Sequence, residues 1–330
     1  GAIEQEIRAD ESSALSPVVN QVRETLLRGT PYANDAGGTV PSFEQMRASD
    51  IRAFYHTWYH PNNATLVVAG NVDPADVLRQ VSALFQAVPR APLPAHKPIQ
   101  LAELQSATIE KSVAVSTPIV ALGYRFPSVT SPDYAPSLVL MLALNNPRGP
   151  LTNLTISGKT AGVSAFANQF RQAGIAYVVA DVTAKSDPKT TQSDVDATLR
   201  SILAQGIPAS FVETAQRQYL MGKSNTLSSV AGLAFGWAGA VSSSEGSPRA
   251  LYEKIAWVTT QDVDRVMRKY FAPDQRIVAL ITPSGAAAGT AQPFAAEKVA
   301  YTGALNDTLP AWASSSFRRL TPPPPIAHVV

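Results

Sequence analysis

The sequence contains no cysteine and only four histidines among its 330 residues. Without cysteine, the chain cannot form a disulfide bond, a thiolate metal site or a cysteine nucleophile. An excess of charge of one sign is also missing, because 27 Lys and Arg stand against 25 Asp and Glu, for a net charge of +2. Nucleic acids and anionic membranes are therefore not expected partners, since both require a basic surface.

Long apolar runs and nucleotide-binding loops are absent as well. The longest run of small apolar residues, VAGLAFGWAGAV at 230–241, is far shorter than the roughly 20 residues that a membrane-spanning helix needs. This run predicts a buried, closely packed helix instead. The sequence has neither of the common glycine-rich phosphate loops, GxxxxGK[ST] or GxGxxG, and no GxSxG nucleophile motif.

One pattern occurs twice in the chain. SDIRAFYHTWYHPNNATLVVAG at 49–70 matches TQDVDRVMRKYFAPDQRIVALIT at 260–282, with Pro61 aligned to Pro273 at an offset of 212 residues. Each copy predicts a capped helix that is stopped by proline and followed by a strand, at 66–68 or 278–280. Recurrence at one long offset predicts two tandem homologous domains. The matched pairs are Asp50 and Asp262, Ile51 and Val263, Phe54 and Val266, Trp58 and Tyr270, and Tyr59 and Phe271.

The two copies differ in what precedes them. The second copy begins near Gln105, whereas Pro61 of the first copy has only 60 residues before it. The first domain is therefore expected to be truncated at its N-terminus by about 110 residues.

The composition along the chain predicts four regions. Residues 1–88 are expected to be the C-terminal part of the first domain, and 89–104 a proline-rich linker. Residues 105–284 are expected to be the second domain, and 285–330 an Ala-, Gly- and Pro-rich tail. Paired strands followed by helices predict the α+β class, with a mainly antiparallel sheet covered by helices on one face in each domain.

The candidate metal ligands are few. His56 and His60 are four residues apart, a spacing that could hold a metal, but helical geometry places them opposite the apolar face that contains Ile51. We interpret them as surface residues, with His60 stabilising the C-terminus of its helix. Glu4 and Glu6, considered alone, are ordinary solvated charges. The residues by themselves predict a duplicated α+β protein without a complete catalytic set.

A family resemblance adds to this interpretation. FYHTWYHPNNATLVVAGNVDPADVLRQVSALF at 54–85 resembles the segment that closes the first domain of insulinase/pitrilysin-type metallopeptidases, a group that includes the mitochondrial processing peptidase. TPYANDAGGTVPSFEQM at 30–46 is similar to the stretch that precedes it in that family. The resemblance extends over residues 1–283, and only the tail lies outside it.

The resemblance implies a zinc ligand. In this family an inverted H-x-x-E-H motif on one helix and a glutamate on a later helix hold Zn²⁺. AIEQEI at 2–7 is similar to the later helix, which puts Glu6 at the ligand position, or Glu4 if the register shifts by two. No H-x-x-E-H occurs in this chain, so the motif would belong to the missing residues. The chain alone is therefore expected to bind Zn²⁺ negligibly and to cleave nothing.

The resemblance also implies partners. Family members enclose a chamber between two halves, where peptides or small unfolded proteins are cleaved. The second half carries R-x₆-Y, and the corresponding segment 152–167 here has neither residue. This favours the zinc-bearing half, with the tail leading to its partner half in the same polypeptide. A non-catalytic scaffold of the same family and an α+β binding module stay open as alternatives. The composition would suit the bacterial periplasm or envelope without defining a compartment.

Overall fold

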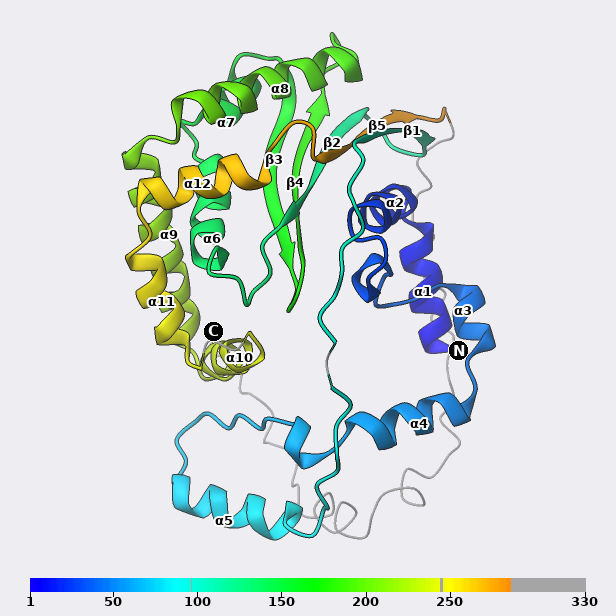
Figure 1. Ribbon diagram of the computed structural model, residues 1–330, viewed down its shortest axis with the longest axis vertical. Helices are drawn as coiled ribbons and strands as arrows, with labels where there is room; N and C mark the ends of the chain where they lie inside the picture. The colour runs from blue at the N-terminus through cyan, green and yellow to red at the C-terminus, as the bar shows by residue number, and fades with distance from the viewer. Residues whose placement is uncertain (96, 244–245, 286–330) are drawn as a thin grey trace, which may run out of the picture. The chain divides into compact units, whose positions relative to one another are not determined.

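The computed structural model describes residues 1–95, 97–243 and 246–285 (Figure 1). The expected tail lies outside these residues. The described residues divide into two compact units, the first within residues 1–71 and 91–285 and the second within residues 72–90. The described part of the second unit contains helix α5, Pro74–Phe85. Asp73 caps α5 by accepting a 2.8 Å hydrogen bond from the Asp76 backbone N–H.

The first unit begins with helices separated by short turns. They are α1 (Ala2–Ser12), α2 (Ser16–Leu26), η1 (Pro31–Ala33), α3 (Val40–Gln45), α4 (Ala48–Trp58) and η2 (Pro61–Asn63). Pro17 lies in the first turn of α2, where its missing N–H costs nothing. Thr39 caps α3 and exchanges hydrogen bonds with Ser42.

A five-stranded sheet forms the rest of the unit together with seven further helices among the described residues. The strands are β1 (Ala107–Val113), β2 (Ile119–Phe126), β3 (Thr160–Gln169), β4 (Gly174–Val182) and β5 (Arg276–Pro283), in the order β1-β5-β2-β4-β3. The helices are α6 (Tyr134–Leu144), α7 (Pro150–Ile156), α8 (Pro188–Gln205), α9 (Ala209–Leu227), α10 (Val230–Ser242), α11 (Pro248–Ala256) and α12 (Thr260–Tyr270). Three strand pairs are antiparallel, and β1 pairs with β5 in parallel. The α+β class is confirmed, with a mixed sheet.

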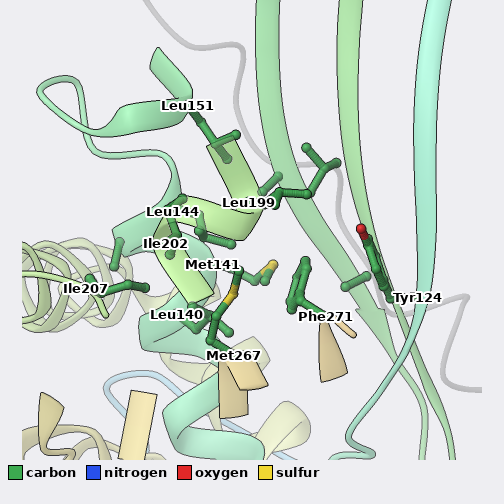
Figure 2. Packing of buried hydrophobic residues seen from close by; sticks show 14 of the residues in the cluster. Tyr124, Leu140, Met141, Leu144, Leu151, Leu199, Ile202, Ile207, Met267 and Phe271 are labelled. Carbon is green, nitrogen blue, oxygen red and sulfur yellow. The ribbon is translucent and has the colours of Figure 1, made fainter. Parts of the chain in front are cut away.

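The inner face of the sheet carries the larger core. Alternate residues of β2, including Leu122 and Tyr124, point toward α6, α8 and α12. Figure 2 shows Phe271 and Met267 lying between Tyr124 of the sheet and Leu140 of α6. The rings of Tyr124 and Phe271 are 4.6 Å apart between centroids. The second copy of the repeated pattern therefore supplies buried core residues.

The outer face of the sheet is also covered, which corrects the expectation of one covered face. Val18, Val22 and Leu26 of α2 are at most 3% exposed and pack on outward-pointing residues of β4 and β5. Figure 1 shows α2 beside the sheet. A half-apolar helix such as α2 needs a partner surface. The sheet supplies it, because its outward-pointing residues, among them Ile277 and Ala279, are apolar.

The repeated pattern is visible in the order of elements. Helices α1 to α4 and the extended segment 64–69 run in the same order as α9 to α12 and β5. The Asp50 carboxylate accepts a 2.8 Å hydrogen bond from the N–H of Arg47, and Asp262 accepts a 3.1 Å bond from the N–H of Thr259. These two caps are related by the same 212-residue offset. The two copies thus share helix starts as well as sequence.

The copies differ in burial. Val263 and Val266 of α12 are fully buried, whereas their counterparts Ile51 and Phe54 are each 59% exposed. The strand predicted at 66–68 does not form, since this segment pairs with no strand among the described residues. A strand exists only where a neighbouring strand accepts its backbone hydrogen bonds. No helix in the described part of the chain has the length and apolarity to cross a membrane.

Candidate functional site

Helix α1 carries the predicted metal ligand and is held to the protein along one side. Ile7 is 5% exposed and is the residue of α1 that is buried. Near the end of the helix, the Glu11 carboxylate accepts a 3.0 Å hydrogen bond from the Val40 backbone N–H at the start of α3. These contacts fix the orientation of α1, so that Glu6, one position before Ile7, is exposed to solvent.

The structure distinguishes Glu6 from Glu4, the alternative ligand. Arg8 donates hydrogen bonds of 2.9 and 2.7 Å to Glu4, whose carboxylate also lies 3.3 Å from the terminal amino group. The hydrogen bond from Arg8 lowers the pKa of Glu4 below its ordinary value. Among the described residues, no hydrogen bond or ion pair joins Glu6 to another group. Glu6 is therefore the carboxylate of this pair that is available to an external ligand or element.

The two histidines of the α4 region do not form a site. The ring Nε2 of His60 donates a 2.6 Å hydrogen bond to the carbonyl of His56, just beyond the end of α4. This contact caps the helix C-terminus, as predicted. A ring nitrogen used in this way is not free to share a metal with His56.

The donor set for a metal is incomplete. Within residues 1–95, 97–243 and 246–285, no group of three or more His, Asp or Glu residues lies close enough to hold a metal ion. Zinc in a catalytic site needs three protein ligands and one open position. The residues described here do not satisfy that requirement, and Glu6 can supply at most one ligand.

Two buried carboxylates were not singled out from the sequence. Asp133 is bound by Arg265, Lys269 and Tyr270, and Asp196 is bound by Arg276. Both are satisfied ion pairs: Asp133 joins the start of α6 to α12, and Asp196 joins α8 to β5. Their partners are more than 75 residues away in sequence, so no local signal could have indicated them.

Comparison with known families now identifies the class. Residues 45–219, more than half of the chain, match the family described as "Peptidase M16 inactive domain". The chain belongs to the M16 peptidase family, and the resemblance to insulinase-type metallopeptidases is confirmed.

Two curated relatives are named as zinc proteases. The chain is 32% identical over 99 residues to an uncharacterised zinc protease of Streptomyces coelicolor and 32% identical over 81 residues to the uncharacterised zinc protease YmfH of Bacillus subtilis. These alignments cover 30% and 24% of this chain, and only 22% and 19% of the relatives. The matched part is thus less than a quarter of either relative's length.

Solved structures share the fold over most of the chain. A protease from Helicobacter pylori superposes with a TM-score of 0.74 at 18% identity, covering 86% of this chain and 70% of that one. A chain of complex III2 from Candida albicans gives 0.71 at 16% identity, covering 85% and 70%. The periplasmic protease PqqL of Escherichia coli gives 0.67 at 18% identity, covering 86% of this chain and 33% of PqqL. At these identities the comparison establishes the fold alone.

Proposed function

We propose that this chain is part of a zinc-dependent endopeptidase of the M16 family and is inactive by itself. In this proposal, Glu6 of α1 supplies one zinc ligand, and an H-x-x-E-H motif in a preceding segment supplies the others. The substrates are peptides or small unfolded proteins, enclosed between this half and a second half. The zinc protease names of both curated relatives support the class of enzyme.

The observation that carries the proposal is that Glu6 is exposed and has no hydrogen-bond or ion-pair partner among the described residues. It stands solvent-exposed on a helix that Ile7 and Glu11 anchor, while the neighbouring Glu4 is neutralised by Arg8. A carboxylate held in place without a partner can join other ligands that approach α1. The described residues hold no complete metal-binding set. In this proposal the chain therefore holds α1 in place and supplies one zinc ligand, and it performs no hydrolytic step by itself.

A second half is supported by the comparison with PqqL. The chain covers 33% of the whole protease but 65% of a structure that contains only its first half, at TM-scores of 0.67 and 0.66. A chain of the present kind therefore corresponds in fold to most of one half of a two-half protease. We propose the same arrangement here, with substrate enclosed between the halves.

The experiment compares zinc content in matched variants. The full-length protein that includes the segment before Gly1 is expected to bind one Zn²⁺ per chain, and the 330-residue chain close to none. Glu6→Gln should lower the zinc content of the full-length protein at least tenfold, in line with the loss of one of three ligands. Zinc is measured by atomic emission after dialysis, and peptidase activity on an unfolded protein is measured in the same samples.

Glu4→Gln is the matched control, because it lies on the same helix and removes the same charge. It should leave the zinc content unchanged. Equal effects of the two substitutions would contradict the assignment of Glu6, and zinc bound stoichiometrically by the 330-residue chain would contradict the division of the site.

A scaffold without catalysis is the second candidate. The family name of the matched region is "inactive domain", and the fold is shared with a chain of complex III2. The segment before Gly1 discriminates between the two candidates. An intact H-x-x-E-H there supports the peptidase, and a motif that lacks either histidine supports the scaffold.

A further inference from the structure

Helix α1 is held to the rest of the protein by few apolar contacts. Ile7 is the one buried side chain of this helix, all of whose residues the structure describes. A segment with little buried apolar surface opens locally at a small cost in free energy. Because Glu6 directly precedes Ile7 on α1, any contact that fixes this helix also fixes the direction of Glu6.

The second copy of the repeated pattern shows how the equivalent helix is held. The 212-residue offset aligns α1 with part of α9 and α3 with part of α11, so that Ile7 and Val40 correspond to Tyr219 and Tyr252. The rings of the two tyrosines meet edge to face, with 6.5 Å between their centroids. The amide of Gln216 also donates hydrogen bonds of 2.8 to 3.2 Å to three carbonyl oxygens at the end of α11 and just beyond it. Helix α9 is thus joined to α11 by an aromatic contact and by a side-chain amide.

The first copy cannot use either of these contacts. Ile7 and Val40 have no rings, and Glu4, the counterpart of Gln216, is engaged by Arg8. Instead, the Glu11 carboxylate accepts its 3.0 Å hydrogen bond from the backbone N–H of Val40. A single polar contact therefore joins α1 to the start of α3.

The segment that receives this bond is itself anchored to α2. The Asp35 carboxylate accepts a hydrogen bond from Arg23 of α2, whose side chain is mostly buried, and another of 2.9 Å from the N–H of Gly37. Gly38 follows with a φ of 74°, a conformation that favours glycine. We call residues 35–40 the brace, because they connect Glu11 of α1 to Arg23 of α2. Since α2 packs on the sheet, the brace links α1 to the core of the protein.

We propose that Glu11 and Asp35 are positioning residues, which act through the brace to hold α1 in the orientation that makes Glu6 a zinc ligand. Neither residue binds the metal in this proposal. Contacts that orient a metal ligand typically change the metal affinity by about 10- to 100-fold when they are removed. This inference rests on the proposed function, because it concerns the same carboxylate, Glu6.

A distance measurement in the 330-residue chain tests the brace without zinc. The chain has no cysteine, so Glu6→Cys on α1 and Ser201→Cys on α8, both at exposed positions, can carry two nitroxide labels. Electron–electron double resonance should give a narrow distance distribution between the labels. Adding Glu11→Ala or Asp35→Ala should about double its width, because α1 loses its link to α2. Adding Glu11→Gln should leave the distribution narrow, since the amide oxygen still accepts a hydrogen bond.

Zinc affinity in the full-length protein, which includes the segment before Gly1, tests the consequence for Glu6. The affinity is measured by competition with a chromophoric chelator. Glu11→Ala and Asp35→Ala should each weaken it about tenfold, and Glu11→Gln less than about twofold. Glu24→Ala is the matched control and should leave the affinity unchanged, because Glu24 is exposed on α2 outside the brace. Far-UV circular dichroism checks that each variant is folded, since a loss of stability alone would not weaken zinc binding by the folded protein.

Three outcomes would overturn the proposal. The first is a distance distribution that stays narrow in both alanine variants. The second is an unchanged zinc affinity in variants whose distribution has broadened. The third is an equal loss in Glu11→Gln and Glu11→Ala, which would exclude the hydrogen bond to Val40 as the cause. A full-length protein that binds no zinc would refute the proposed function, whereas the distance measurement decides separately whether the brace holds α1.

Discussion

Asp133 is a buried carboxylate whose pKa is lowered by three hydrogen-bond donors. It is 3% exposed, and it accepts hydrogen bonds from Arg265, from Lys269 at 2.8 Å and from Tyr270 at 2.9 Å. Burial by itself would raise the pKa of Asp133, but the three donors outweigh burial and lower it to about 2. These contacts attach the start of α6 to α12, the helix formed by the repeated pattern.

The pH dependence of stability follows from this pKa. The folded-state value lies below the ordinary value of 3.8, so the stabilisation is present above about pH 4 and is lost as the pH falls through about 2. The difference corresponds to about 2 kcal/mol. Asp133→Asn should therefore lower the free energy of unfolding by about 2 kcal/mol at pH 7 and by much less near pH 2.5, as measured by urea denaturation.

Asp194→Asn is a suitable control for Asp133→Asn. The ion pair between Asp194 and Lys159, at 2.6 Å, is largely solvent-exposed on the lysine side, and its loss should cost under about 1 kcal/mol. An equal loss of stability at both pH values in Asp133→Asn would contradict an electrostatic role.

At the scale of elements, the contact of α2 with the sheet depends on one glycine. A Cβ built at Gly123 of β2 would lie 2.7 Å from Cγ1 of Val22 and 3.1 Å from Cδ1 of Leu26. The helix is also held at its end, where Arg125 donates a 2.7 Å hydrogen bond to the carbonyl of Leu26. Close approach, apolar contact and a capped C-terminus together place α2 on the sheet.

Gly123→Ala should push α2 away from the outer face. We expect a loss of about 1–3 kcal/mol in the free energy of unfolding, which is typical for overpacking of a tight contact. Gly222→Ala in α9 is the matched control, since a Cβ there meets nothing within 4 Å. The control should be neutral or stabilising by up to about 1 kcal/mol, because alanine favours the helix. Urea denaturation of both variants gives the comparison, and a neutral Gly123→Ala would show that α2 is not closely packed.

At the scale of the whole molecule, the two copies of the repeated pattern differ in burial. Helix α12 and strand β5 contribute buried residues to the core. The corresponding apolar positions of α4 and of residues 64–69 are half-buried or exposed. We propose that a preceding segment completes the first domain.

This proposal predicts unequal effects of equivalent substitutions. Val263→Ala should destabilise the 330-residue chain by about 2 kcal/mol, because it removes buried methyl groups. Its counterpart Ile51→Ala should cost under about 0.5 kcal/mol in the same chain, since Ile51 is 59% exposed. In the full-length protein, Ile51→Ala should cost about 2–4 kcal/mol. The change is followed by thermal and urea unfolding, and a small effect of Ile51→Ala in both proteins would refute the completed first domain.

The sequence predicted the elements well where the signal was local. The apolar run at 230–241 forms the predicted helix as α10, Val230–Ser242, and α4 and α12 begin and end near their predicted caps and prolines, because capping residues and breakers act within a few positions. The family could also be predicted from the sequence, because the segment around Pro61 resembles a known family segment. The candidate site was predicted only as a position, Glu6, because a metal site is defined by groups that meet in space.

The amino-acid sequence by itself determined where helices such as α4, α10 and α12 lie, and that one pattern occurs twice, because these properties depend on neighbours in the chain. Only the tertiary structure decided that β5 lies between β1 and β2, that α2 covers the outer face, and that α12 is buried while α4 is exposed. Burial and pairing depend on surfaces brought together from distant parts of the chain. No local pattern contains that information.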